Sequence, residues 1–213
     1  MSGFMSLFKQ EALKGTYPLA TDNLKGVLVK LPSVTSAMVK TITAATNASP
    51  TVITSTAHGF ANNDRVSISG AVGNTAINGR WKVASVAANT FQLVDIITGA
   101  AVNGNGVFSG SCYVVNLTTL QFLTSIDVAA RASTSGNLGS KTFTLGVFSF
   151  AVITFTAVTT GQTSQAVMFY DDTPATDATK PIIAMDDGAT NLPVLSNGGD
   201  ITYTPNASGL GEI

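Results

Sequence analysis

The sequence predicts a mainly β protein: an antiparallel, β-sandwich-like host domain with one or two short helices, interrupted by an inserted small β-barrel module. Three observations support this fold class. Short runs of alternating apolar and polar residues recur along the 213-residue chain, which is the pattern of half-buried strands. Glycine, asparagine and aspartate separate the runs, as they do in turns. Asn-Gly pairs, which are typical of tight turns, are concentrated in the middle of the chain, so we expect shorter strands and more hairpin turns there.

The first predicted elements are a short helix and a strand. The apolar residues that recur near helical spacing at the start of the chain are Phe4, Leu7, Phe8 and Ala12. They predict a helix over 4–14, which Gly15 would end. The stretch 22–31 then changes to β-branched, alternating residues and stops at Pro32, so we expect a strand there.

Residues 41–113 are predicted to form a separate all-β module. Their runs are short and alternate with a period of two, and Asn-Gly pairs at 78–79 and 103–104 are typical of hairpin turns. The host domain would then consist of 1–40 and 114–213. Such an insertion is tolerated where two chain ends lie close together at a surface.

A second short helix is predicted over 116–126. The residues that would share one helical face are Leu117, Leu120 and Leu123. Thr118 and Gln121 have the spacing of a capping box, which is a signature of a helix start. The remaining strands are expected over 140–158, 164–172, 180–188 and 199–205.

Charge is scarce in this chain. Charged residues make up 11% of it and the net charge is −1, whereas an ordinary soluble domain contains about 25% charged residues. Binding to nucleic acid needs clustered Lys and Arg, so we expect no nucleic-acid partner. No run approaches the roughly 18 apolar residues of a membrane span, so we expect no membrane partner either. A surface with so few charges suits a protein that packs against its own copies or a scaffold.

The single histidine lies in the stretch HGFANNDRVSISG, residues 58–70. A neutral imidazole can serve as a base or a ligand near neutral pH. A metal site needs companion ligands, however, and the chain has no second histidine and one cysteine, Cys112. We therefore expect His58 to be structural, capping a turn or packing beside Phe60, and Asp64 to belong to that turn.

Other candidate catalytic groups also have structural interpretations. The acidic pairs 171–172 and 186–187 could act as acid and base or bind a divalent cation, but each follows a predicted strand, where aspartate is a common turn former. Cys112 lies inside an apolar strand, where thiols are usually inert. We predict no catalytic residue, no metal and no cofactor.

Trp81 is the candidate for an exposed contact with a partner. It stands between Arg80 and Lys82 in an alternating strand, where an indole could stack on a sugar or face another protein. The alternative is that Trp81 anchors the core of the small module, and the sequence leaves both interpretations open.

The motifs of the module resemble those of a known family. The sequence contains HGF at 58–60, D-x-V-x-I-x-G at 64–70, N-G-x-W-x-V at 78–83 and N-T-F-x-L at 89–93. This pattern is similar to the small β-barrel modules named after the first catalytic cysteine half-domain of ubiquitin-activating enzymes, which recur in bacteriophage structural proteins. The chain departs from the pattern at Asn63, where glycine is usual. The chain contains no adenylation motif, so the resemblance does not imply ubiquitin chemistry.

The outer part of the chain resembles a family of small virion proteins of tailed phages. The matching signatures are A-R-x-x-T-S-G-N-L at 130–138, G-V-F at 146–148 and T-x-L-P-V-x-x-N-G-G-D-I-T at 190–202. The resemblance implies a structural virion component that is made in the host cytoplasm and assembled without cleavage.

From these resemblances we expect a capsid decoration or cement protein that bridges capsid subunits. Its partners would be the major capsid protein or other virion proteins, and it would form a homo-oligomer, with a trimer favoured. Phe4, Leu7 and Phe8 would supply an anchoring contact, or would close the host core instead. The alternatives are a neck or tail protein, or a module that binds a receptor or glycan through exposed aromatics such as Trp81 and Tyr113.

Overall fold

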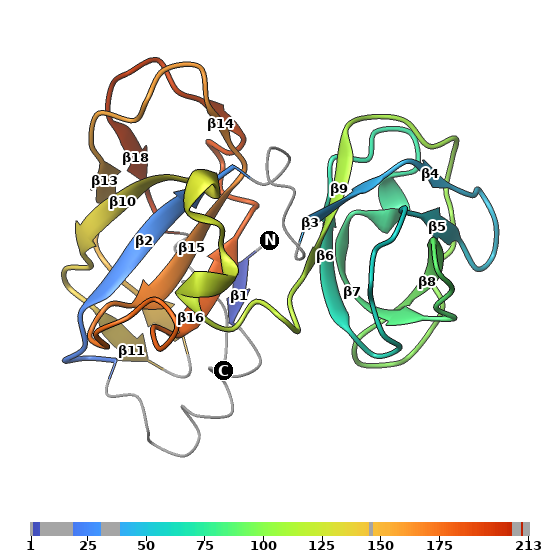
Figure 1. Ribbon diagram of the computed structural model, residues 1–213, viewed down its shortest axis with the longest axis horizontal. Helices are drawn as coiled ribbons and strands as arrows, with labels where there is room; N and C mark the ends of the chain where they lie inside the picture. Colours follow the sequence, from blue (N-terminus) through green and yellow to red (C-terminus); the bar gives the residue numbers. More distant parts are fainter. Residues whose placement is uncertain (1, 5–18, 31–38, 145–146, 206–209, 211–213) are drawn as a thin grey trace. The chain divides into compact units, whose positions relative to one another are not determined.

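The computed structural model describes residues 2–4, 19–30, 39–144, 147–205 and 210. The protein is mainly β, and its strands form antiparallel sheets (Figure 1). Helical turns among the described residues are three short 3-10 segments, namely η1 (Thr75–Ile77), η2 (Leu123–Ser125) and η3 (Val128–Ala130). The predicted fold class is therefore confirmed.

The chain divides into two compact units. The host unit consists of Met1–Val34 and Leu120–Ile213, and the inserted module is Thr35–Thr119. The module is wider than the 41–113 expected from the sequence. Its first and last strands pair with each other, with Val39 opposite Val115, so the module begins before residue 41 and ends after residue 113.

The host unit is built on one five-stranded antiparallel sheet in the order β1-β16-β15-β2-β10, with three two-stranded pairs, β11-β12, β13-β18 and β14-β17. Its strands are β1 (Ser2–Phe4), β2 (Leu24–Val29), β10 (Arg131–Asn137), β11 (Thr142–Thr144), β12 (Val147–Ser149), β13 (Ile153–Phe155), β14 (Thr163–Ser164), β15 (Ala166–Asp171), β16 (Ile182–Asp186), β17 (Val194–Leu195) and β18 (Ile201–Tyr203). Every side chain of β15 is buried, so this strand lies at the centre of the host core.

A second layer covers this sheet and makes the host unit sandwich-like. At Gly26 in β2, an added Cβ would lie 2.9 Å from Ile153 Cδ1, so β13 packs closely over the sheet. The ring centroid of Phe169 lies 5.1 Å from that of Phe150 and 5.5 Å from that of Tyr203. Such aromatic contacts bury much apolar area and hold the two layers together.

A buried hydrogen bond ties the second layer to the sheet. The Tyr203 hydroxyl donates to Asp186 Oδ2 at 2.7 Å, and the other carboxylate oxygen accepts the backbone N–H of Gly188 at 2.9 Å. Burial, followed by the bond to the Asp186 carboxylate, raises the pKa of Tyr203. The phenol is therefore neutral in the folded protein at ordinary pH, and it links β18 to β16.

The module is a single curled, barrel-like sheet. Its strands are β3 (Val39–Ile42), β4 (Ala44–Ala45), β5 (Val52–Thr54), β6 (Arg65–Ser69), β7 (Gly79–Ala84), β8 (Thr90–Val94) and β9 (Cys112–Asn116), in the order β3-β9-β6-β7-β8-β5-β4. The two outermost strands of this order, β3 and β4, are separated by Thr43 alone, and its backbone N–H donates to Thr54 O at 2.9 Å. One bent strand therefore pairs with both ends of the sheet and curls it around an apolar core.

The helix predicted over 116–126 is wrong. Strand β9 runs to Asn116, whose Oδ1 accepts the backbone N–H of Thr118 at 2.9 Å and closes a turn, an alternative that asparagine offers to helix formation. The Arg131 guanidinium then donates to the carbonyls of Leu123 at 2.7 Å and Ile126 at 2.8 Å, which holds the end of this segment in its turn conformation. The regular leucine spacing reflects burial in a turn-rich segment that contains only η2.

The helix predicted over 4–14 lies, apart from its first residue, outside the described residues. Phe4 is the last residue of β1 and pairs with Ala184 of β16, so the predicted start of the helix is wrong at this position. The pairing satisfies the backbone of an edge strand, which a short periodic pattern cannot foresee.

The host unit should lose stability in alkali through Tyr170. Burial, together with nearby Asp172 and Asp177, raises the pKa of Tyr170 from 10.0 to about 12. Because the folded pKa lies above the unfolded one, the stabilisation is complete below about pH 10 and is lost as the pH rises towards about 12. Urea unfolding between about pH 8 and 12 should show this fall, and Tyr170→Phe should show a smaller one. An equal fall in both proteins would contradict the assignment.

Candidate functional site

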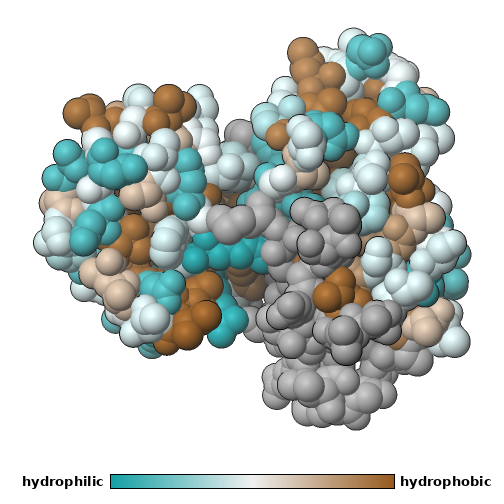
Figure 2. All heavy atoms as spheres, turned by 180° about the vertical axis from the view of Figure 1, so that it is seen from behind, coloured by the Kyte–Doolittle hydropathy of each residue, from teal (hydrophilic) through white to brown (hydrophobic). Residues whose placement is uncertain are grey.

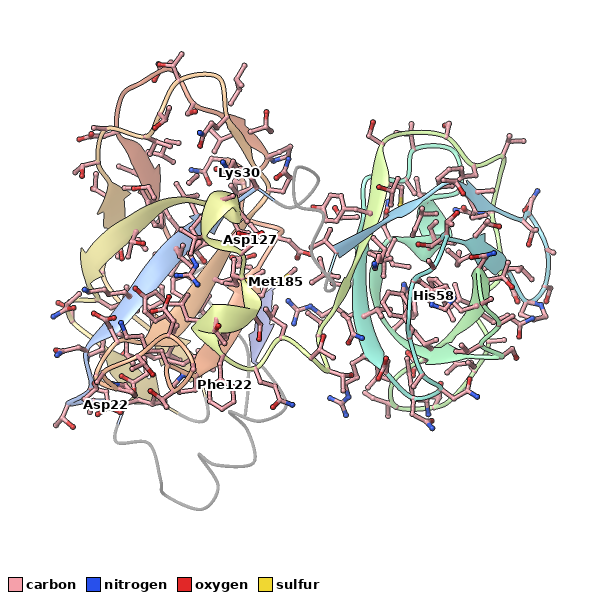
Figure 3. The ribbon with its side chains drawn as sticks, in the orientation of Figure 1. Asp22, Lys30, His58, Phe122, Asp127 and Met185 are labelled. Carbon is pink, nitrogen blue, oxygen red and sulfur yellow. The ribbon has the colours of Figure 1, made fainter. Side chains whose placement is uncertain are left out.

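His58 lies inside the module, among the side chains of the barrel core (Figure 3). It is 2% exposed, and its ring centroid lies 4.9 Å from that of Phe60 and 5.1 Å from that of Phe91. Its Nδ1 accepts the backbone N–H of Phe60 at 3.0 Å, so the proton of the neutral ring is on Nε2. Within the described residues, Nε2 has no hydrogen-bond partner. These contacts are those of a packed, turn-forming histidine.

Asp64 closes the turn that follows. Its Oδ2 accepts the backbone N–H of Ala61 at 2.9 Å and the side-chain amide of Asn116 at 3.0 Å, which joins the turn to β9. Asn63 has a φ of 75°, a left-handed conformation that asparagine tolerates better than most residues. Asparagine can therefore stand where the resembling modules usually have glycine.

Trp81 lies at the margin of the module core. It is half-buried and packs against the core cluster, and its Nε1 donates to Ile77 O at 2.8 Å. Its indole lies beside Gly79, where an added Cβ would come within 3.1 Å of the ring. Because the polar atom of the indole is already bonded, the geometry is that of a core anchor with one exposed side.

The other sequence candidates do not converge on one site. Phe4 has its backbone in β1, and Leu7 and Phe8 lie outside the described residues. In the acidic pairs, Asp171 accepts the backbone N–H of Thr173 at 2.8 Å in a turn. Cys112 is buried, and burial raises the pKa of its thiol to about 12, so it is not a ready nucleophile.

Asp172 is held by cations of the host unit. Its carboxylate lies 2.6 Å from Lys25 Nζ and 2.7 Å from Lys180 Nζ. Nearby, Arg131 pairs with Asp177 at 2.6 Å, so two carboxylates of the 171–180 segment are neutralised by ion pairs. Arg131 belongs to the signature at 130–138, and its role is to fasten this loop and the turn that replaces the predicted helix.

Two glycine-rich loops of the module lie in backbone contact. They are 70–73 and 106–110, and we call this end of the barrel the glycine-packed loop end. An added Cβ at Gly73 would lie 1.8 Å from Val107 O, and one at Gly106 would lie 2.4 Å from Gly73 O. At Gly73 and Gly106, a residue with a Cβ would fit only if the backbone of the neighbouring loop moved.

Asparagine side chains fix these loops in place. Asn74 is fully buried, donates to Thr46 O at 3.1 Å and accepts the backbone N–H of Asn105 at 3.1 Å. Asn78 bonds both backbone groups of Ala71, at 3.0 and 2.8 Å. Amide side chains therefore replace a regular strand ladder at this end, and the loops are positioned by fixed polar contacts.

The glycine-packed loop end presents two exposed valines. The large apolar side chains that are exposed among the described residues are Val72, Ile97, Val107, Val128, Val152 and Leu195. Val72 is 69% exposed and Val107 is 82% exposed, and the Val72 N–H donates to Ser109 O at 2.9 Å across the two loops. The segments 70–78 and 103–111 contain no charged residue. Rigid loops with uncharged apolar tips are suited to contact with another protein.

On the face of the molecule in Figure 2, hydrophilic, weakly polar and hydrophobic residues are interspersed, and the hydrophobic ones form separate patches. The Asn-Gly pair at 103–104 predicted a hairpin turn, and the sequence did not mark the two valines as candidates. The available signal was a pair of glycine-containing stretches, each with a valine, at 70–73 and 104–110, but their proximity depends on the fold.

The described part of the chain contains no group of three or more His, Cys, Asp or Glu residues that could hold a metal ion. No helix in those same ranges is long and apolar enough to cross a membrane. No family model matches the sequence, and no curated protein matches it.

Gly73→Ala should destabilise the module, because the new Cβ would overlap Val107 O. Overpacking of this kind costs about 1–3 kcal/mol of the free energy of unfolding. Trp81 is the single tryptophan and lies in the module, so its fluorescence during urea unfolding reports the loss. Gly139→Ala, where nothing lies within 4 Å of an added Cβ, is the control and should leave that transition in place.

His58→Ala should cost about 2–4 kcal/mol, since it removes both the ring packing and the acceptor of the Phe60 N–H. His58→Asn keeps an acceptor at this position and His58→Phe keeps the ring, so each should cost less than alanine. The same Trp81 fluorescence measures all three variants. A neutral effect of His58→Ala would show that the buried imidazole is not a structural element.

Proposed function

We propose that this protein is a structural component of a bacteriophage virion, one that decorates the capsid and stabilises the head by bridging capsid subunits. The observation that carries the proposal is the glycine-packed loop end, where Val72 and Val107 are exposed on fixed, uncharged loops. Such a surface offers apolar area that a capsid joint can bury.

The two sequence resemblances support this class of protein. The signature at 130–138 supplies β10 and Arg131, and the signature at 190–202 supplies β17 and the start of β18. These residues build the scaffold of the host unit. A structural role in a virion requires a stable scaffold with surfaces that contact other virion proteins, and it requires no catalytic centre.

Decoration would stabilise the head through linked binding. A partner that binds the assembled shell and not the separated subunits shifts the equilibrium towards the shell. Burying each valine contributes about 1.5–3 kcal/mol at most, so repetition over many copies is needed for a large effect. The sparse charge of the chain, 11% of its residues, favours close contact with copies and with the shell.

The number of copies per particle tests the proposed position. Image reconstruction and quantitative gels of particles that contain the protein should give on the order of hundreds of copies at symmetric positions on the head, as decoration requires. On the order of 6 or 12 copies, in a ring of cyclic symmetry, would place the protein in the neck or tail and contradict the proposal.

The valines should determine affinity for the capsid. The double variant Val72→Ser with Val107→Ser should bind undecorated capsids roughly tenfold more weakly than the wild type, because it exposes less apolar surface to bury. Ile97→Ser changes a side chain that is 93% exposed at another turn of the module and serves as the matched control. Equal binding by the wild type and the double variant in a pelleting assay would show that the glycine-packed loop end does not contact the capsid.

A further inference from the structure

The outward positions of β6, β7 and β8 carry three cations and no carboxylate. Val66, Val83 and Phe91 point into the core from β6, β7 and β8, so the residues that alternate with them point outward. The charged residues at these outward positions are Arg65, Arg80 and Lys82, and the others are small, apolar or uncharged polar residues. We call this surface the β6–β7 face.

Two of these cations lie directly opposite each other. The register places Arg65 across from Lys82, and like charges in this position destabilise a pair of antiparallel strands. Arg65 is exposed and Lys82 is half-buried. Within the described residues, neither forms a salt bridge with a carboxylate. The repulsion between them is therefore available to be relieved by an anionic partner.

The two carboxylates of the module are already in use. Asp64 bonds the backbone of its own turn and the amide of Asn116. Asp95 Oδ1 accepts the backbone N–H of Thr98 at 2.7 Å, its hydroxyl at 2.9 Å and the N–H of Ile97 at 3.0 Å. These bonds, with the Thr98 N–H the strongest, lower the pKa of Asp95. Both acids are committed to turns.

Opposite charge is concentrated in the C-terminal third of the sequence. Residues 142–213 contain seven acidic residues and a single cation, Lys180. Among the described acids of this stretch, Asp200 is the exposed one, and it follows the Gly198-Gly199 turn before β18. Its Oδ1 accepts the backbone N–H of Ala157 at 2.8 Å, which fixes the carboxylate in place. Leu195, 66% exposed, belongs to the same C-terminal segment.

From this complementarity we infer that the β6–β7 face of one copy binds the Asp200 turn of the host unit in a second copy, with Arg65 and Lys82 directed at that carboxylate. The contact is head to tail, because the module of one chain meets the host unit of another. Contacts of this kind close into rings when the rotation between copies permits. The inference rests on the proposed function, for which self-association would supply the symmetric oligomer.

The composition of the face favours a protein over a nucleic acid. Three cations on this part of the sheet neutralise few phosphates, and they are interspersed with Val52, Ala84 and Val94 on neighbouring outward positions. A polar surface with small apolar residues is typical of the rim of a protein interface. A second copy of the chain also supplies the required carboxylate at the same concentration as the cations.

The test measures the mass of the purified full-length chain in solution. Sedimentation equilibrium over a range of protein concentrations should show a discrete oligomer in about 0.05 M salt and weaker association in about 0.5 M salt, since exposed charge pairs are screened. Arg65→Gln with Lys82→Gln should weaken association roughly tenfold. Asp200→Asn should do the same, and it keeps an oxygen for the Ala157 N–H.

Controls separate charge from folding. Lys30→Gln with Lys40→Gln removes the same charge from other strand ends and should leave association unchanged. The chain that combines Arg65→Asp with Asp200→Arg exchanges the charges and should associate more tightly than either single reversal. Trp81 fluorescence checks that the module is folded in every variant.

Several outcomes would overturn the inference. A monomer at every concentration and salt would do so, and so would association that the Arg65 and Lys82 substitutions leave unchanged. Binding of these cations to DNA or to an anionic polysaccharide, with association unaffected, would assign the face to another partner. If the Arg65 and Lys82 variants lose self-association but still bind capsids, the inference is supported and the proposed function is unaffected. If the Val72 and Val107 variants bind capsids as the wild type does, the proposed function is contradicted and the inference about self-association is unaffected.

Discussion

The pairing of β3 with β9 is the constraint on which the two-unit architecture depends. The chain enters the module through β3 and leaves it through β9, and Val39 of β3 pairs with Val115 of β9. The antiparallel ladder brings the two ends of the insertion side by side, so the host sequence can resume without a long connection. The same strand continues through Thr43 into β4 and joins the far edge of the sheet. One segment therefore both attaches the module and closes its sheet.

Closure has a cost at the ends of the barrel, where strands give way to loops with unpaired backbone groups. This chain satisfies them with asparagine and aspartate side chains. Asn74, Asn78 and Asn116 bond backbone or side-chain groups of neighbouring segments, and Asp64 and Asp95 bond the N–H groups of their own turns. The few acids of the module are therefore used inside it, and its cations dominate the charge on its surface.

The sequence predicted strands better than it predicted the turns between them. Alternation indicated β6, and short apolar runs bounded by turn residues placed β2, β15 and β16 within the expected stretches. The leucine spacing over 116–126 also reflects burial, but it suggested a helix where Asn116 and Arg131 direct the backbone into turns. A periodic pattern indicates which side chains are buried. It does not indicate which backbone carbonyls will accept hydrogen bonds from a side chain outside the segment, such as Arg131.

The sequence by itself determined that this chain is a charge-poor, mainly β protein with a distinct central module, since composition and alternation are local properties. It also indicated a structural His58, because a lone histidine lacks companion ligands. Only the tertiary structure decided that Val72 and Val107 lie together, because glycines far apart in the sequence let two loops touch. It alone set Arg65 opposite Lys82, because strand register depends on packing of the whole sheet.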